Sequence, residues 1–303
     1  MIKSVEDYLN QLEKELKGSD TALIHDALSD AEEHLRTGLA ILGQQRPGNS
    51  ESEALSSIVS QYGSPGEIAA AYREIDIYPP APFPVGMSRR RRRTLAPFFG
   101  VLGDPHAWGA FFYMLVSVVT GCLFGLWALM GILLSAISLV FIIGIPVAGG
   151  FLLSIRGIAL IEGRLVEAML GTRMPRRPLF LPKSLGWTDK LKQLFTERYT
   201  WKILFYLASL FPLGLIYFFL VVLMFSGSVS LILSSLFELV FHLPLELFGE
   251  NRFTPVWLLP VLNLTGLFLF VLMFHVVKFI GIIHARFARA MLILKPKPEE
   301  DVI

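Results

Sequence analysis

The feature that most constrains this chain is an uncharged stretch of 51 residues. Residues 105–155 contain no Lys, Arg, Asp or Glu. A helix needs about 20 predominantly apolar residues to cross a bilayer, so this stretch is long enough to cross twice. The chain as a whole is 53% hydrophobic and only 17% charged, against roughly 25% charged in an average soluble domain. This composition excludes an ordinary soluble enzyme and indicates a polytopic membrane protein.

The charged residues are distributed unevenly between two parts of the chain. Residues 1–80 hold 6 basic and 14 acidic side chains, whereas residues 81–303 hold 21 basic and 11 acidic ones. This asymmetry predicts two modules with separate roles, an acidic head and a basic membrane domain. An acidic surface is poorly suited to a phosphate backbone, so we expect no binding to nucleic acid and favour a protein partner for the head.

The head, residues 1–76, is predicted to be a small helical domain. Apolar residues recur at i, i+3 and i+4 spacing from Val5 to Leu16, and Gly18 ends this run. Further helices are predicted over about 19–42, 51–61 and 66–74. So few helices bury only a small core, which makes support from a partner or from the membrane surface plausible.

Three residues of the second predicted helix share one face. Asp26, Asp30 and His34 lie at i, i+4 and i+8. This spacing fits either a metal or proton site or a solvated acidic face. We favour the solvated face, because no ligand from another element is evident.

Three short motifs of the head are similar to a known signalling domain. They are VEDYLNQL at 5–12, EEHL at 32–35 and YGSPGEIA at 62–69. Together they resemble the HAAS-type helical signalling domain, which has a Tyr-Leu opening, an acidic helix with a histidine, and a Gly-x-Pro ending. The resemblance implies a cytoplasmic regulatory domain that is fused to membrane spans.

Residues 77–95 are predicted to form a linker. The sequence YPPAPFP at 78–84 is typical of a stiff, extended spacer. We interpret the basic run behind it as a topology signal that holds the N-terminus in the cytoplasm, with contact to anionic lipid as a by-product. The run consists of Arg89, Arg90, Arg91, Arg92 and Arg93.

The membrane domain, residues 96–294, is predicted to cross the bilayer four times, at about 108–129, 135–155, 203–225 and 256–278. Residues 156–202 hold ten Lys and Arg, whereas residues 227–254 hold only Arg252. Because Lys and Arg gather on the cytoplasmic side, we expect the basic loop and the tail at 295–303 to lie inside. Both termini are then cytoplasmic.

Distinctive residues recur at two fixed offsets, which predicts that the membrane domain consists of two repeats. Both copies would begin on the same side of the membrane, so the repeats would be parallel. The second copy has gained about 29 residues near 233–261. An offset of +93 pairs Trp108 with Trp201, Phe112 with Phe205 and Tyr113 with Tyr206, and an offset of +122 pairs Arg156 with Lys278 and Arg164 with Arg286.

The non-cytoplasmic insertion at about 227–254 holds one polar stripe. Glu238, His242 and Glu246 have i, i+4, i+8 spacing among apolar neighbours. A helix of this kind is typical of a membrane interface. The alternative is a face that senses metal or protons, since His titrates in the physiological range and carboxylates bind cations.

Two further features lie in or beside the second span. Gly144 and Pro146 are predicted to interrupt it, either as a packing kink, which we favour, or as a moving hinge. Glu162 and Arg164 follow the span and are expected to pair with the region of His284 and Arg286 in the other copy.

The membrane domain is also similar to a known family. Its motifs are FFY at 111–113, GIP at 144–146, RGIALIE at 156–162 and LG at 170–171. They resemble the four-span "Putative sensor" membrane family, whose members often precede histidine kinases. No kinase follows residue 294, so any output is expected to pass through the head or a separate protein. The resemblance implies a bacterial cytoplasmic membrane protein.

These observations predict an all-α protein that acts as a non-enzymatic membrane sensor or regulator. The head would pass a membrane or extracytoplasmic signal to a cytoplasmic partner. We expect no cofactor, and no nucleophile motif or zinc-binding His-Glu-x-x-His sequence is present. The alternative is a small transporter or lipid-handling protein, which would need polar residues inside its spans. The stimulus and the formation of a homo-oligomer stay open.

Overall fold

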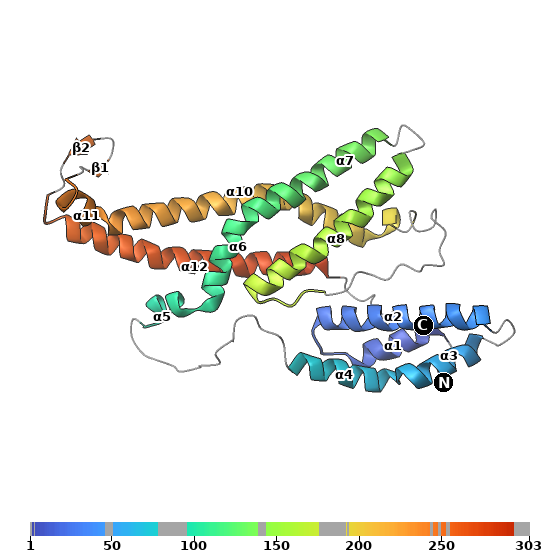
Figure 1. The fold of residues 1–303 in the computed structure, drawn as a ribbon. Helices are drawn as coiled ribbons and strands as arrows, with labels where there is room; N and C mark the ends of the chain where they lie inside the picture. The colour runs from blue at the N-terminus through green and yellow to red at the C-terminus, as the bar shows by residue number, and fades with distance from the viewer. Residues whose placement is uncertain are drawn as a thin grey trace, which may run out of the picture.

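The computed structural model describes residues 2, 4–45, 51–77, 96–138, 144–175, 192, 194–242, 245–247, 250–252 and 255–293. A head of short helices lies beside four long helices (Figure 1). The predicted all-α architecture of a helical head and four long apolar helices is confirmed. The arginines 89–93 lie outside the described residues, so their role in topology and lipid contact stays a prediction.

The head consists of α1 (Val5–Glu15), α2 (Thr21–Gln45), α3 (Glu51–Tyr62) and α4 (Pro65–Ile77). Tyr8 is fully buried in its core, and its hydroxyl donates to the carbonyl of Gly63 at 2.8 Å. Gly63 has a φ of +117°, which glycine adopts readily. Ser64 and Glu67 then form a capping box at the start of α4. The Gly-Ser-Pro motif is thus a turn followed by a helix cap.

The face of α2 that carries Asp26, Asp30 and His34 is buried at one end and exposed at the other: Asp26 is buried, Asp30 is half-buried and His34 is exposed. The hydroxyls of Tyr62 and Tyr72 donate to Asp30 Oδ2 at 3.2 and 3.1 Å. The ring of His34 stacks on that of Tyr62, with centroids 4.4 Å apart. The expectation of a solvated acidic face is therefore wrong for Asp26, which is buried, and for Asp30, which α3 and α4 cover with tyrosines, whereas His34 is exposed as expected.

Within the described residues, four helices are long and apolar enough to cross a membrane, which makes the chain an integral membrane protein. The first is continuous from α6 (Pro105–Thr120) through a π-helical segment η2 (Gly121–Gly125) to α7 (Leu126–Ser138). The others are α8 (Gly144–Leu170), α10 (Arg198–Ile232) and α12 (Leu259–Leu292). A short helix α5 (Ala96–Phe99) and a 3-10 turn η1 (Gly100–Gly103) precede them.

The long helices extend beyond the spans that hydropathy marks. The first continues through residues 130–134, where the sequence predicted a turn. Pro146 lies in the first turn of α8, where the missing N–H costs no helical hydrogen bond, so Gly144 and Pro146 begin this helix instead of interrupting it. Pro212 in α10 is a proline inside a long helix.

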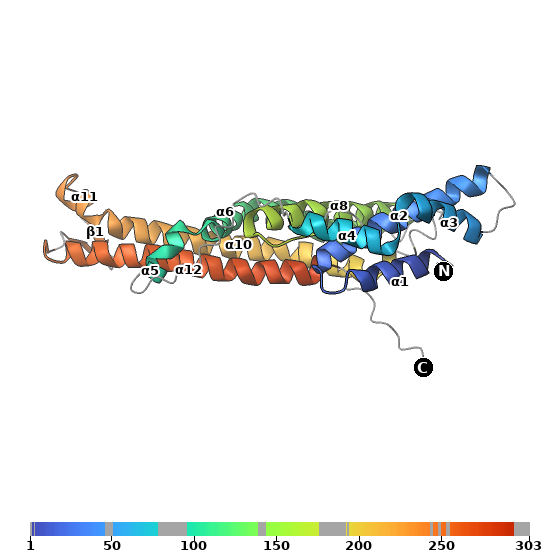
Figure 2. The same ribbon diagram turned by 90° about the horizontal axis from the view of Figure 1, so that it is seen from below.

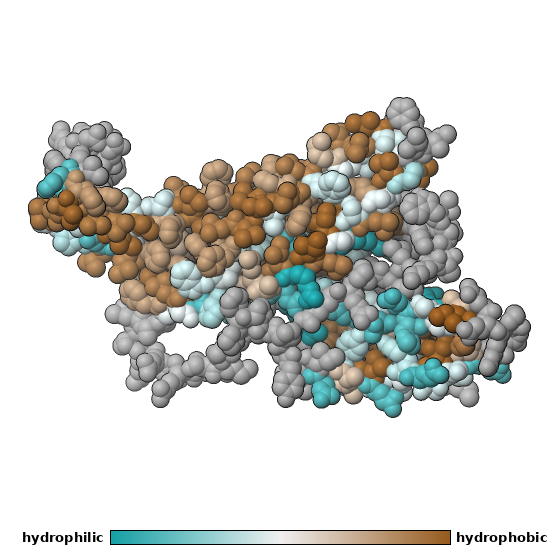
Figure 3. All heavy atoms as spheres, in the orientation of Figure 1, coloured by the Kyte–Doolittle hydropathy of each residue, from teal (hydrophilic) through white to brown (hydrophobic). Residues whose placement is uncertain are grey.

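The last two long helices, α10 and α12, lie side by side along their lengths in two perpendicular views (Figures 1 and 2). On the face that Figure 3 shows, apolar residues cover most of the long helices, whereas the head has both hydrophilic and apolar residues at its surface. Such a surface fits lipid around the long helices and water around the head.

Two glycines bring α10 against the first long helix. A side-chain methyl at Gly121 would overlap the carbonyl oxygen of Leu210, and a methyl at Gly214 would overlap that of Ser117. Small residues permit such close backbone approach between membrane helices. The contact is reciprocal, because each helix supplies one glycine and one carbonyl.

We predict that Gly214→Ala destabilises the membrane domain by about 1–3 kcal/mol, the usual cost of overpacking. Gly227→Ala is a matched control in the same helix, since a methyl there meets no atom within 4 Å. Thermal unfolding in detergent measures both. Equal melting temperatures for the two variants would contradict the packing argument.

Candidate functional site: a buried polar cluster

Polar side chains from four long helices meet in one buried cluster. The Tyr113 hydroxyl of α6 donates to Glu162 Oε1 of α8 at 2.8 Å and lies 2.6 Å from His284 Nε2 of α12. From α10, the Tyr206 hydroxyl lies 3.2 Å from His284 Nε2, and the Tyr217 hydroxyl lies 3.2 Å from Nδ1. We call these five residues the polar cluster.

The centre of the cluster is buried, whereas Tyr217 at its edge is half-buried. Glu162 is 0% exposed and His284 is 1% exposed. Glu162 Oε2 has no hydrogen-bond partner in the described part of the chain. A carboxyl group and an imidazole in an apolar bundle are costly, so they mark a functional site by default. Both groups can gain or lose a proton, which makes a change of charge the chemistry that this site offers.

The sequence predicted part of this arrangement. It expected Glu162 to pair with the region of His284, and the structure joins the two through the hydroxyl of Tyr113 in place of a salt bridge. The partners Tyr206 and Tyr217 were not predicted. The offset of +93 from Tyr113 to Tyr206 was the signal that could have found the first of them.

Two ion pairs lie at the starts of α6 and α10. Lys278 Nζ of α12 contacts Asp104 Oδ2 at 2.6 Å, and Arg156 of α8 pairs with Glu197. Arg156 also donates to Thr200 Oγ1 at 2.8 Å. Burial alone would raise the pKa of Asp104, but the hydrogen bonds from Lys278 and from the His106 N–H hold that pKa below its ordinary value.

Two tryptophans make corresponding bonds near these ion pairs. The Trp108 indole donates to the Leu102 carbonyl at 2.8 Å, and the Trp201 indole donates to the Phe195 carbonyl at 2.9 Å. Both bonds join residues six positions apart. Each indole thereby fixes the chain that leads into a long helix.

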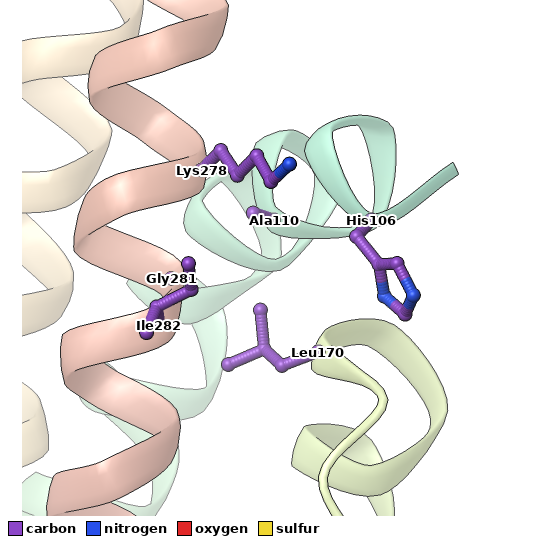
Figure 4. A pocket seen from close by; sticks show the side chains of 6 residues that line it. All are labelled: His106, Ala110, Leu170, Lys278, Gly281 and Ile282. Carbon is purple, nitrogen blue, oxygen red and sulfur yellow. The ribbon is translucent and has the colours of Figure 1, made fainter. Parts of the chain in front are cut away.

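A small cavity of about 220 Å³ opens beside the Lys278 ion pair. His106 from the start of α6 and Leu170 from the end of α8 border it, and Lys278, Gly281 and Ile282 line it from α12 (Figure 4). Ala110 completes the lining. The wall is largely apolar, and none of its residues belongs to the polar cluster.

The insertion does not form the continuous helix that the sequence suggested. Glu238 is buried in α11 (Ser234–Leu239), which ends before His242. His242 has a φ of 52° and is exposed, and Glu246 lies in β1 (Leu245–Leu247), which pairs with β2 (Glu250–Arg252). The three residues therefore share no helical face. No group of three or more metal-binding side chains gathers among the described residues.

The head contacts the membrane domain next to the polar cluster. Arg289 Nη2 of α12 lies 2.5 Å from Asp20 Oδ2 at the start of α2. Arg289 follows His284 by five residues on the same helix. One helix therefore joins the buried cluster to the head.

The fold and the cluster define a polytopic α-helical membrane protein with an attached helical head. The model of the family described as "Putative sensor" matches residues 113–292, which is more than half of the chain, and the protein belongs to this family. The match includes every residue of the polar cluster. A search of curated proteins and a search of solved structures each gave no match.

We predict that Tyr113→Phe destabilises the membrane domain by about 1–3 kcal/mol, because Glu162 and His284 each lose a buried hydrogen bond. Tyr217→Phe removes a hydroxyl whose one hydrogen bond within the described residues is to His284, so it is expected to cost less. Thermal unfolding in detergent compares the two. A larger loss for Tyr217→Phe would show that Tyr113 is not the central link.

Proposed function

We propose that this protein is a non-enzymatic membrane sensor whose helical head passes the signal to a cytoplasmic partner protein. The observation that carries the proposal is the position of two contacts on α12. His284 belongs to the polar cluster, and Arg289 holds Asp20 of the head. Membership of the "Putative sensor" family supports a sensing role.

The input of the sensor is a change at the polar cluster. A proton gained or lost by Glu162 or His284 changes the hydrogen bonds that join α6, α8, α10 and α12. A charge in low-dielectric surroundings interacts strongly with its neighbours. Movement of α12 in response would displace Arg289 and weaken its contact with Asp20 of the head.

The membrane domain is proposed to consist of two parallel repeats, with both termini in the cytoplasm. The offsets of +93 and +122 relate Tyr113 to Tyr206 and Glu162 to His284, so the four central residues form two equivalent pairs. Three pairs of contacts recur at these offsets and support the duplication. They are the glycine contacts of Gly121 and Gly214, the indole bonds of Trp108 and Trp201, and the ion pairs Lys278–Asp104 and Arg156–Glu197.

A small transporter is the second candidate, and the polar cluster favours it. Buried ionisable groups mark ion pathways in many transporters. A transport role predicts that Glu162→Gln abolishes uptake in proteoliposomes, whereas a sensor shows no flux in either form. Proton flux through the wild-type chain, measured with a pH-sensitive dye, separates the two functions.

The identity of the head as a HAAS-type domain stays a prediction, as does its binding to a partner protein.

We expect a chain that lacks residues 1–76 to insert into the membrane as the full chain does, because the apolar helices begin at residue 105. The same deletion should abolish capture of the cytoplasmic partner. Membrane fractionation checks insertion, and failure to insert would contradict the modular organisation.

The proposed coupling is tested by His284→Asn in the full chain. We expect faster hydrogen exchange at the start of α2, because the altered cluster displaces α12 and weakens the contact between Arg289 and Asp20. His275→Asn is the matched control, since His275 lies in the same helix but bonds to the Phe98 carbonyl at 2.9 Å. Equal exchange in the two variants would argue against α12 as the connection.

A further inference from the structure

A second cavity lies where the head meets the membrane domain. It measures about 250 Å³ and is lined by Thr21 of α2 and by Arg286, Arg289, Ala290 and Ile293 of the α12 end. Pockets for drug-sized ligands range from about 300 to 1,000 Å³. This cavity therefore suits one compact polar group.

The charge of the cavity is positive. Arg286 and Arg289 are three residues apart, so they lie on neighbouring positions of one helix surface. Arg286 is exposed and forms no ion pair with any described residue, and Arg289 pairs with Asp20. The first turn of α2 contains no acidic residue, and Asp20, which directly precedes this helix, is the carboxylate that contacts Arg289.

The corresponding stretch of α8 has a different charge pattern. Arg164 occupies the position that the +122 offset relates to Arg286, and it pairs with Glu167 at 3.2 Å. The same offset relates Glu167 to Arg289. The end of α8 is thus internally neutralised, whereas the end of α12 has a second arginine where α8 has its acid.

Asp20 is a weak partner for Arg289, so a more highly charged anion can displace it. Their side chains are 24% and 38% exposed, and ion pairs open to solvent contribute little stability. Asp20 also accepts the Ala22 N–H through Oδ1 at 2.8 Å, so it presents only one oxygen to Arg289. A phosphate group has more charge and matches guanidinium groups in bidentate geometry.

We propose that this cavity binds a phosphate group through Arg286 and Arg289, in competition with Asp20, and that binding releases the head from α12. The geometry of the cavity supports the binding site, whereas the release of the head rests on the proposed sensor function. The phosphate comes either from an anionic lipid headgroup at the membrane surface or from a soluble anion, and the two share the same chemistry.

The test uses the full chain in nanodiscs of phosphatidylcholine. In the first arm, pyrophosphate is titrated into these nanodiscs and its binding is measured by calorimetry. In the second arm, native mass spectrometry compares the lipid retained by the protein from nanodiscs with and without phosphatidylglycerol. We expect Arg286→Gln to weaken binding at least about tenfold, which corresponds to the loss of one charge-assisted hydrogen bond. Arg164→Gln is the control on α8 and should leave binding unchanged. Binding in only one arm identifies the source of the phosphate.

Hydrogen exchange at the start of α2 separates the site from its consequence. Exchange should rise when the anion binds, and Asp20→Asn should both raise exchange without anion and strengthen binding, because the competing carboxylate is gone. Arg286-dependent binding without any change in exchange would overturn the release of the head but retain the site. Equal binding by Arg286→Gln and Arg164→Gln, or no binding in either arm, would overturn the site itself.

Discussion

The hydroxyl of Tyr113 is the interaction on which the membrane domain depends most. In apolar surroundings a polar group must find its partners within the protein, because lipid supplies none. Glu162 and His284 arrive from different helices, and both reach the same hydroxyl. Each group therefore limits where the other can be placed. This shared bond aligns α6, α8 and α12 far more specifically than lipid-like side chains could, since such side chains pack almost equally well in several registers.

Ion pairs within the fold explain why α8 and α12 extend past the spans that hydropathy predicted. The predicted spans ended at 155 and 278, where the uncharged runs meet Arg156 and Lys278. The structure pairs these side chains with Glu197 and Asp104, and the helices continue to Leu170 and Leu292. A window of hydropathy cannot register that a charge is neutralised by a residue over 40 positions away. The number of spans could be predicted, whereas their lengths depended on tertiary contacts.

The candidate site was predictable only where a single helix or a fixed offset between similar residues carried the information. The offsets related Tyr113 to Tyr206, and the position of Glu162 pointed to His284. Other residues gained their surroundings from distant elements. Asp30 was expected in solvent because Tyr62 and Tyr72 belong to other helices, and the stripe from Glu238 to Glu246 fails because the backbone leaves the helix before His242. The spacing of polar residues in a sequence assumes an unbroken helix and does not predict the residue at which that helix ends.

The relative strengths of two contacts determine how far the proposed sensor can respond. A change of charge in the polar cluster is worth several kcal/mol, because a buried ion loses its hydration. The partly exposed contact between Asp20 and Arg289 is worth about 1 kcal/mol. His284 and Arg289 are five residues apart, or about 7.5 Å along a helix, so a displacement at one reaches the other within a rigid segment.

The coupling between two sites cannot exceed the smaller of the two free-energy changes. Here that is the loss of the Asp20–Arg289 contact, and about 1 kcal/mol changes a population roughly fivefold. In the proposed sensor, a change of charge in the polar cluster would therefore be large enough to release the head, and the weak contact would give a graded response in place of an all-or-none one.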